Sequence, residues 1–514
     1  MLLPDPKIIT FRQAAYTPAL ALVGKYLSCF ATKPFEHQLV GIAYLLANPT
    51  FALFDEMGVA KSKQAIDAAG IMFAEDLIDR VVLVAPAKVC SRVWSDPEDG
   101  QLATHGWGIP GHPLHYNASY RRLLSGEGGL HGHLITWMTV SYELLRDEKH
   151  LQAITAWLNR VKGRTWLVLD ECHALKNRTA QQTKAVAKLR ELCERCTLMT
   201  GSPVANNPLD LWSPLRIMDR QVLPFKNFYQ FRARYAVMGG YMHKQPVQWV
   251  NQDELQGLIT PYVLRREKKD VLSYLPPKLF EQVEVPLSVE SWKVYRELKQ
   301  EAMAALGEGE SVLTANAGVK LMRLSQVCQG FIGGVDNVDH PEAKVKELGQ
   351  EKLQEIKELL DQWSDRRVVV WCRFRLQLQQ VHLLLYRMER QAFKIWGGLT
   401  TKQQDVEIHG FKTYENAVMV AQQQAGGQGL NDLVLSSSVI YASNDFNLLS
   451  REQSEDRSHR PGQHNPVTYV DLLATGPNGQ KTIDHVVLKA LRQKRNLATE
   501  TTAYWRRELA DVKN

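Results

Sequence analysis

The feature that most constrains the fold is a repeated alternation of strand-length apolar runs with helical segments. Apolar runs lie at 81–85, 134–138, 166–169 and 197–199, and a second series lies at 368–371, 393–396, 417–421, 439–442 and 467–472. Continuous apolar strands that alternate with helices are typical of parallel sheets covered on both faces. A chain of 514 residues is too long for one hydrophobic core. We therefore predict an α/β protein with two lobes, each built around a parallel sheet.

The segment between the two series differs in composition. From about Leu209 to Leu348 it is rich in Lys, Arg, Tyr, Phe and Glu at helical spacing, which predicts helical insertions between the lobes. After Leu473 the turn 476–479 is followed by a basic helical pattern. The predicted domains are a first lobe at 1–208, insertions and linker at 209–349, a second lobe at 350–475 and a C-terminal helical brace at 476–514.

Composition narrows the class of protein only modestly. The net charge of +7 permits a nucleic-acid partner without requiring one. The apolar runs are too short to span a bilayer, and the first residues lack the pattern of a signal peptide. Seven scattered cysteines, including the lone pair Cys193 and Cys196, favour reduced thiols over disulfides or zinc. These observations predict a cytoplasmic protein with no membrane partner.

A phosphate-binding loop is predicted directly after the apolar strand 51–54. The order is strand, then Asp55-Glu-Met-Gly58-Val-Ala60-Lys61-Ser62, then a helix. In such a loop the backbone N–H groups face phosphates, Lys61 reaches the outer ones, and the Ser62 hydroxyl ligates Mg²⁺. Ala60 stands where a second glycine is usual, and its methyl group reduces the freedom of the backbone there.

A second candidate site is the acidic end of the apolar strand 165–169. Asp170 and Glu171 follow this strand, and adjacent side chains at a strand end alternate in direction. One carboxylate can therefore hold a Mg²⁺ ion while the other faces an attacking water. We interpret Asp170 as the metal ligand and Glu171 as the residue that polarises the water. A solvated strand end without function is the competing interpretation.

The segment Asp170-Glu-Cys-His-Ala-Leu-Lys-Asn177 resembles the second motif of helicase superfamily two, and specifically of its Swi/Snf branch of double-stranded DNA translocases. The resemblance covers nearly the whole chain. Further segments similar to motifs of this family, in the family's order, are 34–38, 84–87, 140–143, 198–207, 261–278, 321–328, 368–374, 395–398, 425–431 and 453–463. The resemblance implies two RecA-like lobes with helical insertions between them, ATP as substrate and Mg²⁺ as cofactor.

The resemblance also implies roles for single residues. Gln38 corresponds to the adenine-reading position, and Asp55, Gly429 and Gln463 are added to the expected nucleotide contacts. Arg457 and Arg460 are expected to supply positive charge to the γ-phosphate from the second lobe. We also interpret them as lying on one face of a helix. The residues expected to contact nucleic acid are Pro86, Ala87, Lys88, Ser141, Lys176, Asn177, Asn206, Asn207, Arg373, Gly397, Gly398, Gln423 and Gly426.

These expectations combine into a DNA-dependent ATPase that moves along double-stranded DNA without obligate strand separation. We expect a monomer in a bacterial, archaeal or phage-infected cell, with a possible protein partner on DNA. Three alternatives remain open from the sequence: a helicase for RNA or single strands, the motor subunit of a restriction or defence assembly, and a scaffold that binds DNA without turnover. The last is favoured only by Ala60 and by the run Gln422–Gln424, which departs from the family pattern.

Overall fold

The chain forms two compact units in the computed structural model. The first contains residues 1–273 with 497–514, and the second contains residues 274–496. Each unit is described by itself. The structure describes residues 6–98, 100–109, 112–113, 115–119, 135–160, 163–204, 208–239, 245–307, 313–333, 345–423 and 432–493.

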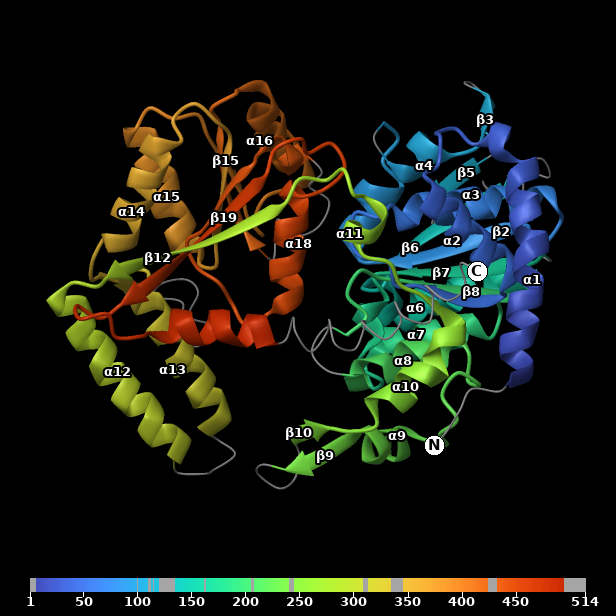
Figure 1. Cartoon of the computed structure of the whole chain (residues 1–514), viewed down its shortest axis with the longest axis horizontal. Helices are drawn as coiled ribbons and strands as arrows, with labels where there is room; N and C mark the ends of the chain where they lie inside the picture. The colour runs from blue at the N-terminus through green and yellow to red at the C-terminus, as the bar shows by residue number, and fades with distance from the viewer. Residues whose placement is uncertain are drawn as a thin grey trace. The chain divides into compact units, whose positions relative to one another are not determined.

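The first unit is built on a parallel sheet of seven strands (Figure 1). The strands follow the order β11-β1-β8-β7-β2-β6-β5, and every neighbouring pair is parallel. Their bounds are β1 Thr50–Leu53, β2 Arg80–Ala85, β5 His115–Ser119, β6 Ile135–Ser141, β7 Thr165–Asp170, β8 Arg195–Met199 and β11 Val263–Leu264. The prediction of a parallel sheet in this lobe is confirmed. It missed the edge strands β5 and β11.

Successive side chains of the central strands enter two different cores, one on each face of the sheet. In β2, Val81 and Leu83 pack with α1, α2 and α3, whereas Val82 and Val84 pack with α6, α7 and α8. This alternation explains why the strands read as continuous apolar runs, since both faces are covered. The helices named here are α1 Pro6–Lys25, α2 Glu36–Ala47, α3 Lys61–Ala74, α6 Glu148–Arg160, α7 Gln181–Arg190 and α8 Trp212–Met218.

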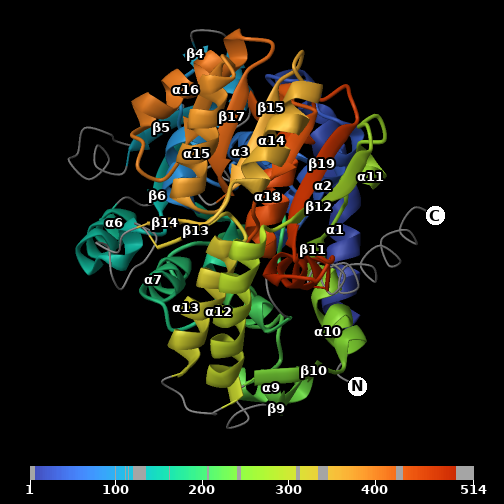
Figure 2. The same ribbon diagram turned by 90° about the vertical axis from the view of Figure 1, so that its left-hand side faces the viewer.

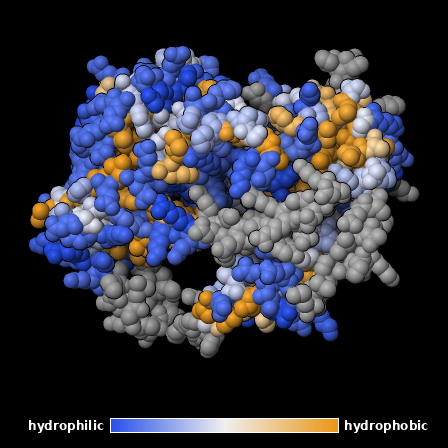
Figure 3. All heavy atoms as spheres, viewed as in Figure 1, coloured by the Kyte–Doolittle hydropathy of each residue, from blue (hydrophilic) through white to orange (hydrophobic). Residues whose placement is uncertain are grey.

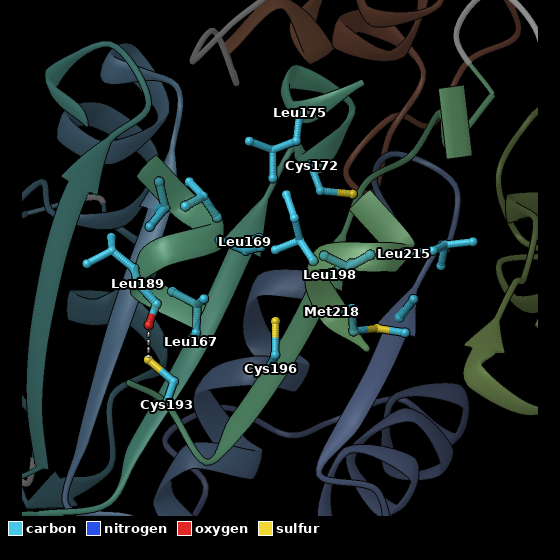
Figure 4. Close-up of a cluster of buried hydrophobic side chains, with 14 of the residues drawn as sticks. Leu167, Leu169, Cys172, Leu175, Leu189, Cys193, Cys196, Leu198, Leu215 and Met218 are labelled. Carbon is cyan, nitrogen blue, oxygen red and sulfur yellow. Dashed lines mark hydrogen bonds between the residues drawn. The ribbon is translucent and has the colours of Figure 1, made fainter. Parts of the chain in front are cut away.

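Figure 4 shows the core beneath β7 and β8. Leucines of both strands meet side chains from α7 and α8, and three cysteines lie among them. Cys172, Cys193 and Cys196 are buried and carry free thiols, and Cys193 Sγ donates a hydrogen bond to the carbonyl oxygen of Leu189 at 3.2 Å. The pair Cys193 and Cys196 is therefore part of the hydrophobic core. Cys172, directly after Glu171, anchors the acidic strand end in this core.

The rest of the first unit consists of short elements. The segment 209–273 contains a two-stranded antiparallel hairpin, β9 and β10, besides its helices. The remaining elements are η1 Leu27–Cys29, η2 Val89–Trp94, α4 Gln101–His105, β3 Gly108–Ile109, β4 His112–Pro113, η3 Leu144–Arg146, η4 Cys172–Leu175, η5 Pro208–Leu211, α9 Phe228–Tyr235, β9 Ala236–Gly239, β10 Gln245–Trp249, α10 Gln252–Ile259, η7 Thr260–Tyr262 and α11 Lys268–Val271.

The second unit is built on a parallel sheet of six strands in the order β12-β19-β18-β15-β17-β16. Helices α14 and α15 pack on one face with Val368 and Val370, and α16 packs on the other with Val369 and Trp371. The bounds are β12 Lys278–Pro286, α14 Glu351–Gln362, β15 Val368–Cys372, α15 Arg375–Arg387, β16 Ala392–Ile395, α16 Thr401–Thr413, β17 Val418–Gln422, β18 Ser438–Tyr441 and β19 Val467–Thr475. The second predicted parallel sheet is confirmed.

A separate hydrophobic cluster joins the helical part of this unit. Helices α12 Val289–Gly307 and α13 Leu313–Val327 lie side by side (Figure 2) and contribute Tyr295 and Val327 to it. The described C-terminal helix 483–493 contributes Val487 and Leu491. The other elements of the unit are β13 Phe331–Ile332, β14 Lys346–Glu347, η8 Asp432–Leu435 and α18 Leu448–Ser458. The division of the chain at 209, 349 and 476 stays a prediction.

One strand of the second sheet departs from the predicted pattern. Residues 278–286 were expected to belong to helical or linker material, but they form β12, which pairs in parallel with β19 from Lys278↔Val467 to Pro286↔Thr475. Most of its residues are exposed or half-buried, so it carries no continuous apolar run. Glutamate and glutamine residues interrupt its apolar residues, so the continuous run that predicted the other strands is absent here.

The surface is largely hydrophilic on the face that can be seen in Figure 3. Hydrophobic residues form small separate patches on this face. Within the part of the chain that the structure describes, no helix combines the length and apolar character needed to cross a bilayer.

Candidate nucleotide site

The predicted phosphate loop connects β1 to α3 in the first unit. Gly58 has φ +79°, and the helix begins at Lys61, so the N–H groups of its first turn lie at the end of the loop. Lys61 Nζ donates hydrogen bonds to the carbonyl oxygens of Asp55, at 2.7 Å, and Glu56, at 3.1 Å. Ser62 is the second residue of α3. The loop therefore places Lys61 and Ser62 in the first turn of α3, and Lys61 folds back over the carbonyl oxygens at the start of the loop.

Ala60 adopts the left-handed conformation that its position demands. Its φ is +58° and ψ is +52°, and it caps α3 without a side-chain hydrogen bond. Glycine adopts this conformation freely, whereas a Cβ atom costs about 1–2 kcal/mol. The loop thus keeps the backbone geometry that glycine would give, at a cost in stability.

The acidic end of β7 lies in the same sheet, separated from β1 only by β8. Asp170 Oδ2 accepts a hydrogen bond from Trp94 Nε1 at 2.8 Å, and Oδ1 accepts one from the N–H of Glu171 at 3.0 Å. Glu171 Oε2 accepts a hydrogen bond from Thr200 Oγ1 at 3.2 Å and lies 3.3 Å from His173 Nδ1. The two carboxylates therefore have separate sets of partners, as the alternation at a strand end predicts.

The two carboxylates also differ in their acidity. Burial raises the pKa of Asp170, and the nearby charge of Glu171 raises it further. Burial acts in the same direction on Glu171, but the hydrogen bond and charge of His173, the charge of Lys61 and the hydrogen bond from Thr200 together hold its pKa below the usual range. Lys61 thus acts electrostatically on both groups, which ties the phosphate loop to the acidic strand end.

The residues at this end of the sheet fit a magnesium ion that is bound together with phosphates. The buried carboxylate of Asp170 accepts its hydrogen bonds from two neutral donors, an indole and a backbone N–H, so a cation would relieve the cost of its burial. Among the described residues, no three His, Cys, Asp or Glu side chains gather into a metal site of their own. Mg²⁺ usually takes one or two carboxylates and completes its shell with phosphate oxygens and water. Ser62 and Asp170 remain the predicted protein ligands.

The side chains of two other predicted nucleotide contacts, Asp55 and Gln38, are engaged within the protein. The Asp55 carboxylate is fully buried and forms an ion pair with Arg266. The Gln38 amide oxygen accepts a hydrogen bond from the N–H of Phe35 at 2.8 Å, which caps α2. Phe35 is exposed and its ring stacks on His37. Contact of Gln38 or Asp55 with the nucleotide stays a prediction.

Two basic residues after β11 hold the phosphate loop. Arg265 Nη1 donates hydrogen bonds to the carbonyl oxygens of Phe54, at 2.6 Å, and Gly201, at 2.8 Å, and Arg266 pairs with Asp55. Arg265 and Arg266 therefore brace the phosphate loop of their own unit.

The predicted arginines of the second lobe lie at the C-terminal end of α18. Arg457 belongs to the helix, but the helix ends at Ser458 and Arg460 lies in the turn beyond it. The expectation that both lie on one helix face is therefore wrong, because the chain leaves the helix between them. Burial lowers the pKa of Arg460, although the charges of Asp456 and Asp432 act against this. Their entry into the nucleotide site stays a prediction.

Gln463 is buried and its amide group is fully engaged. Nε2 donates hydrogen bonds to the carbonyl oxygens of Val434, Ser436 and Ser458, and Oε1 accepts from the N–H groups of His464 and Asn465. This pattern fixes the turn after α18. The side chain therefore has a structural role in this arrangement, and its contact with a nucleotide stays a prediction. Gly429 lies outside the described residues.

The described nucleic-acid residues predicted for the first unit lie at or after the C-terminal ends of its strands. Pro86, Ala87 and Lys88 follow β2, and the N–H of Ala87 donates to Glu143 Oε2 at 3.1 Å. Burial and the nearby charge of Arg92 lower the pKa of Lys88. The remaining members are Ser141, whose hydroxyl caps the next turn through Leu144, the exposed pair Lys176 and Asn177, and Asn206 and Asn207, which lie outside the described residues.

In the second unit, a hydrogen-bonded group connects two of the predicted contact segments. Gln422 Nε2 donates to the carbonyl oxygen of Arg373 at 3.3 Å, and its Oε1 accepts from the N–H of Gly397 at 3.4 Å. Gly398 follows in the same turn. Gln423 is buried and donates to Asn444 Oδ1 at 3.3 Å, so its side chain points into the unit. Gly426 lies outside the described residues.

Sequence reasoning missed the residues that orient the two carboxylates. The side chain of Trp94 is fully buried, and its Nε1 donates to Asp170 Oδ2. Tyr142 Oη donates to the carbonyl oxygen of Asp170 at 3.0 Å, and Thr200 contacts both Glu171 and His173. These contacts join residues far apart in the sequence, and periodicity carries no signal of them. The one available signal is that Trp94, Tyr142 and Thr200 each carry a polar atom within an apolar segment. Buried polar atoms usually have a hydrogen-bond partner, so a partner could have been expected for each.

The fold and the site define an α/β nucleotide-binding protein with a phosphate loop and an acidic strand end in one parallel sheet. Comparison with protein families gives the particular family. The family described as SNF2-related domain matches residues 37–330, and the family described as Helicase conserved C-terminal domain matches residues 351–462. The chain belongs to the SNF2-related family and carries a helicase C-terminal domain after it.

Similar proteins occur in plants and bacteria. The chain is 24% identical over 500 residues to the "Probable ATP-dependent DNA helicase CHR12" of Arabidopsis thaliana, an alignment that covers 93% of this chain and 43% of that protein. It is 28% identical over 358 residues to the "Putative ATP-dependent helicase/translocase YwqA" of Bacillus subtilis, covering 65% of this chain and 35% of that protein. The chain thus spans less than half the length of these relatives.

A solved structure is similar over most of the chain. The "Sulfolobus solfataricus SWI2/SNF2 ATPase core in complex with dsDNA" is 20% identical, with a TM-score of 0.41, and the match covers 92% of this chain and 93% of that one.

Proposed function

We propose that this protein is a DNA-dependent ATPase that couples ATP hydrolysis to movement along double-stranded DNA, without obligate strand separation. The observation that carries the proposal is the placement of Lys61 and of the pair Asp170 and Glu171 at the ends of β1 and β7 in one sheet. The carboxyl ends of parallel strands meet at one edge, where α/β proteins bind ligands. Membership of the SNF2-related family supports the same activity.

The side chains of the first unit have distinct roles in hydrolysis. Lys61 leaves the carbonyl oxygens of Asp55 and Glu56 to bind the outer phosphates, and the N–H groups at the start of α3 bind the others. Ser62 and Asp170 would hold Mg²⁺, which would supply positive charge against the phosphates. Glu171 keeps its negative charge through His173 and Thr200, and it polarises the attacking water.

The second unit supplies the remaining parts of the reaction in this proposal. Arg457 and Arg460 stabilise the charge on the transferred phosphoryl group when the two units close around the nucleotide. Repeated closing and opening moves the two units relative to each other. If both units grip a nucleic-acid backbone, this movement becomes stepping. Contacts to the backbone carry little sequence information, so binding is largely non-specific and weakens with salt. We propose a cytoplasmic monomer that acts on duplex DNA.

Phosphate release with different nucleic acids tests the substrate. We expect duplex DNA to raise the rate of ATP hydrolysis by at least about tenfold, which corresponds to about 1.4 kcal/mol of barrier, and single strands or RNA to raise it less. A triplex-displacement assay on duplex DNA then tests movement directly. Equal or greater stimulation by RNA would favour a helicase for RNA or single strands. Absence of any phosphate release would favour a scaffold, for which the strained Ala60 is the supporting observation.

A further inference from the structure

Segment 263–268 is joined to the phosphate loop by hydrogen bonds along its whole length. The N–H of Phe54 donates to the carbonyl oxygen of Leu264 at 2.8 Å, and the N–H of Glu56 donates to that of Arg266 at 2.9 Å. In return, the N–H of Lys268 donates to Glu56 Oε2 at 2.7 Å. This segment comes shortly before residue 273, where the chain passes from the first unit to the second.

The guanidinium group of Arg266 is the centre of this connection. Its Nε donates to Asp55 Oδ1 at 3.0 Å and its Nη2 contacts Asp55 Oδ2, so the buried carboxylate is held in two places. Nη2 also donates to Gln64 Oε1 at 2.8 Å, and Nη1 donates to the carbonyl oxygen of His37. One planar fork therefore ties the phosphate loop to α3 and to the start of α2, beside Gln38.

The backbone around this fork leaves room for it. A Cβ atom on Gly41 of α2 would overlap Gln64 Oε1 and meet Arg266 Nη2 at 2.9 Å. Glycine at this position therefore permits the close approach of the two side chains. A methyl group there would push the guanidinium group away from its partners without changing any charge.

Asp55 and Glu56 contact both the phosphate-binding lysine and segment 263–268. Their carbonyl oxygens accept hydrogen bonds from Lys61 Nζ, whereas their carboxylates bind Arg266 and the N–H of Lys268. When phosphates bind Lys61, the carbonyl oxygens of Asp55 and Glu56 lose its ammonium group, whereas their carboxylates keep Arg266 and the N–H of Lys268. A change in the loop therefore has a side-chain route to the segment through Asp55 and Arg266, beside the hydrogen bonds of Glu56.

We infer that Arg266 is a positioning residue that couples nucleotide binding at the phosphate loop to the segment through which the chain leaves the first unit. The inference rests on the nucleotide-binding part of the proposed function and adds the route by which binding is sensed. Arg266 touches neither phosphate nor metal in this role. It acts through Asp55, Gln64 and the carbonyl oxygen of His37.

Hydrogen exchange of the full chain, with and without a non-hydrolysable ATP analogue, tests the coupling. In the wild type we expect the analogue to slow exchange in 263–273 by at least about twofold, because phosphates order the loop. In Arg266→Lys, which keeps the charge but loses the fork, we expect this slowing to disappear while the dissociation constant for the analogue changes by less than about threefold. DNA stimulation of hydrolysis should fall in the same variant.

Two further variants keep the test independent of folding. Gly41→Ala displaces the fork with every charge retained and should reduce the same response. Arg234→Lys alters a second bidentate pair, Arg234 with Glu254, elsewhere in the first unit and should leave the response as in the wild type.

Full slowing of exchange in Arg266→Lys would overturn the inference, as would a wild type that binds the analogue with no change in 263–273. A wild type that shows the slowing but no DNA-stimulated hydrolysis would instead overturn the proposed function and leave the coupling intact.

Discussion

The two units treat a buried aspartate in opposite ways. The carboxylate of Asp170, at the end of β7 in the first unit, accepts hydrogen bonds from neutral donors, the indole of Trp94 and a backbone N–H. Asp471, within β19 of the second unit, receives a fork from Arg451 and a further hydrogen bond from Asn444 at 2.8 Å. Both side chains are buried. Among the described residues Asp170 has no direct ion pair and feels only the nearby charge of Lys61, whereas Asp471 is paired directly with Arg451.

The difference distinguishes a buried charge that is available to a ligand from one that is neutralised within the fold. A buried carboxylate without a direct ion pair is costly, and burial accordingly raises the pKa of Asp170. That cost is relieved when a cation binds, so the site is prepared for one. Asp471, Arg451 and Glu455 instead form a closed group under the ring of Tyr441, which the Arg451 guanidinium approaches at 3.4 Å. The second unit uses its charges for rigidity.

The largest expected effect comes from breaking the closed group. Arg451→Ala removes the ion-pair partner of buried Asp471 and one of the two cationic partners of Glu455, which keeps Lys278 at 3.3 Å. It should lower the stability of the second unit by about 3–5 kcal/mol. Hydrogen exchange of peptides from β18 and β19 measures the loss, with β7 as the internal reference. Adding Asp471→Asn should recover part of it. Unchanged protection in β19 would contradict the structural role of the group.

The next effect concerns activity. Glu171→Gln keeps the shape of the side chain but removes the negative charge held by His173 and Thr200, and it should reduce ATP hydrolysis by at least about a hundredfold. Binding of ATP and DNA should persist, as measured by fluorescent nucleotide titration and by gel shift. Substantial DNA-stimulated hydrolysis by this variant would remove Glu171 from its assigned role.

A smaller effect is expected from the neutral partner of Asp170. Trp94→Phe deletes the N–H that donates to Asp170, and it should lower the free energy of unfolding by about 2 kcal/mol, since hydrogen bonds to charged groups are the stronger ones. Trp166→Phe is the matched control, because Trp166 donates to the neutral hydroxyl of Thr197 at 3.0 Å. Denaturant unfolding should show the larger loss for Trp94. Equal losses would indicate that the charge of Asp170 does not strengthen its hydrogen bond with Trp94.

The smallest effect tests the strain in the phosphate loop. Ala60→Gly should raise the free energy of unfolding by up to about 1 kcal/mol, because glycine adopts a φ of +58° without strain. Ala65→Gly, inside α3, should lower it by about the same amount, because glycine weakens a helix interior. Thermal unfolding of both variants checks the opposite signs. A loss of stability in Ala60→Gly would show that the methyl group contributes packing that outweighs the strain.

The sequence predicted those parts of the fold that have a local signal. Both parallel sheets followed from continuous apolar runs such as 81–85, and the phosphate loop followed from the order of Gly58, Lys61 and Ser62. The edge strands β11 and β12 were missed, since one has two residues and the other is largely exposed. Edge strands are stabilised by pairing, which depends on residues far away in the chain.

The site was predictable only where a residue's role follows from its neighbours in sequence. Asp170 and Glu171 were predicted from one strand end. Trp94 and Arg266 were not, because each reaches its partner from a distant segment. A glutamine such as Gln463 matches a motif equally well whether its amide faces a ligand or, as here, closes a turn through five hydrogen bonds.

The pairing of β12 with β19 has a consequence for the order in which the chain folds during its synthesis. All seven strands of the first sheet precede residue 265, so this sheet can close while the ribosome is still making the rest. By contrast, β12 begins at Lys278 but cannot pair until its partner strand β19, which begins at Val467, has been synthesised. Until then β12 is a strand without its neighbour, and such strands readily join other chains. The charges of Glu281 and Glu284 oppose that association. The same residues that interrupt the apolar pattern of β12 therefore help to keep it from pairing with other chains until β19 has been synthesised.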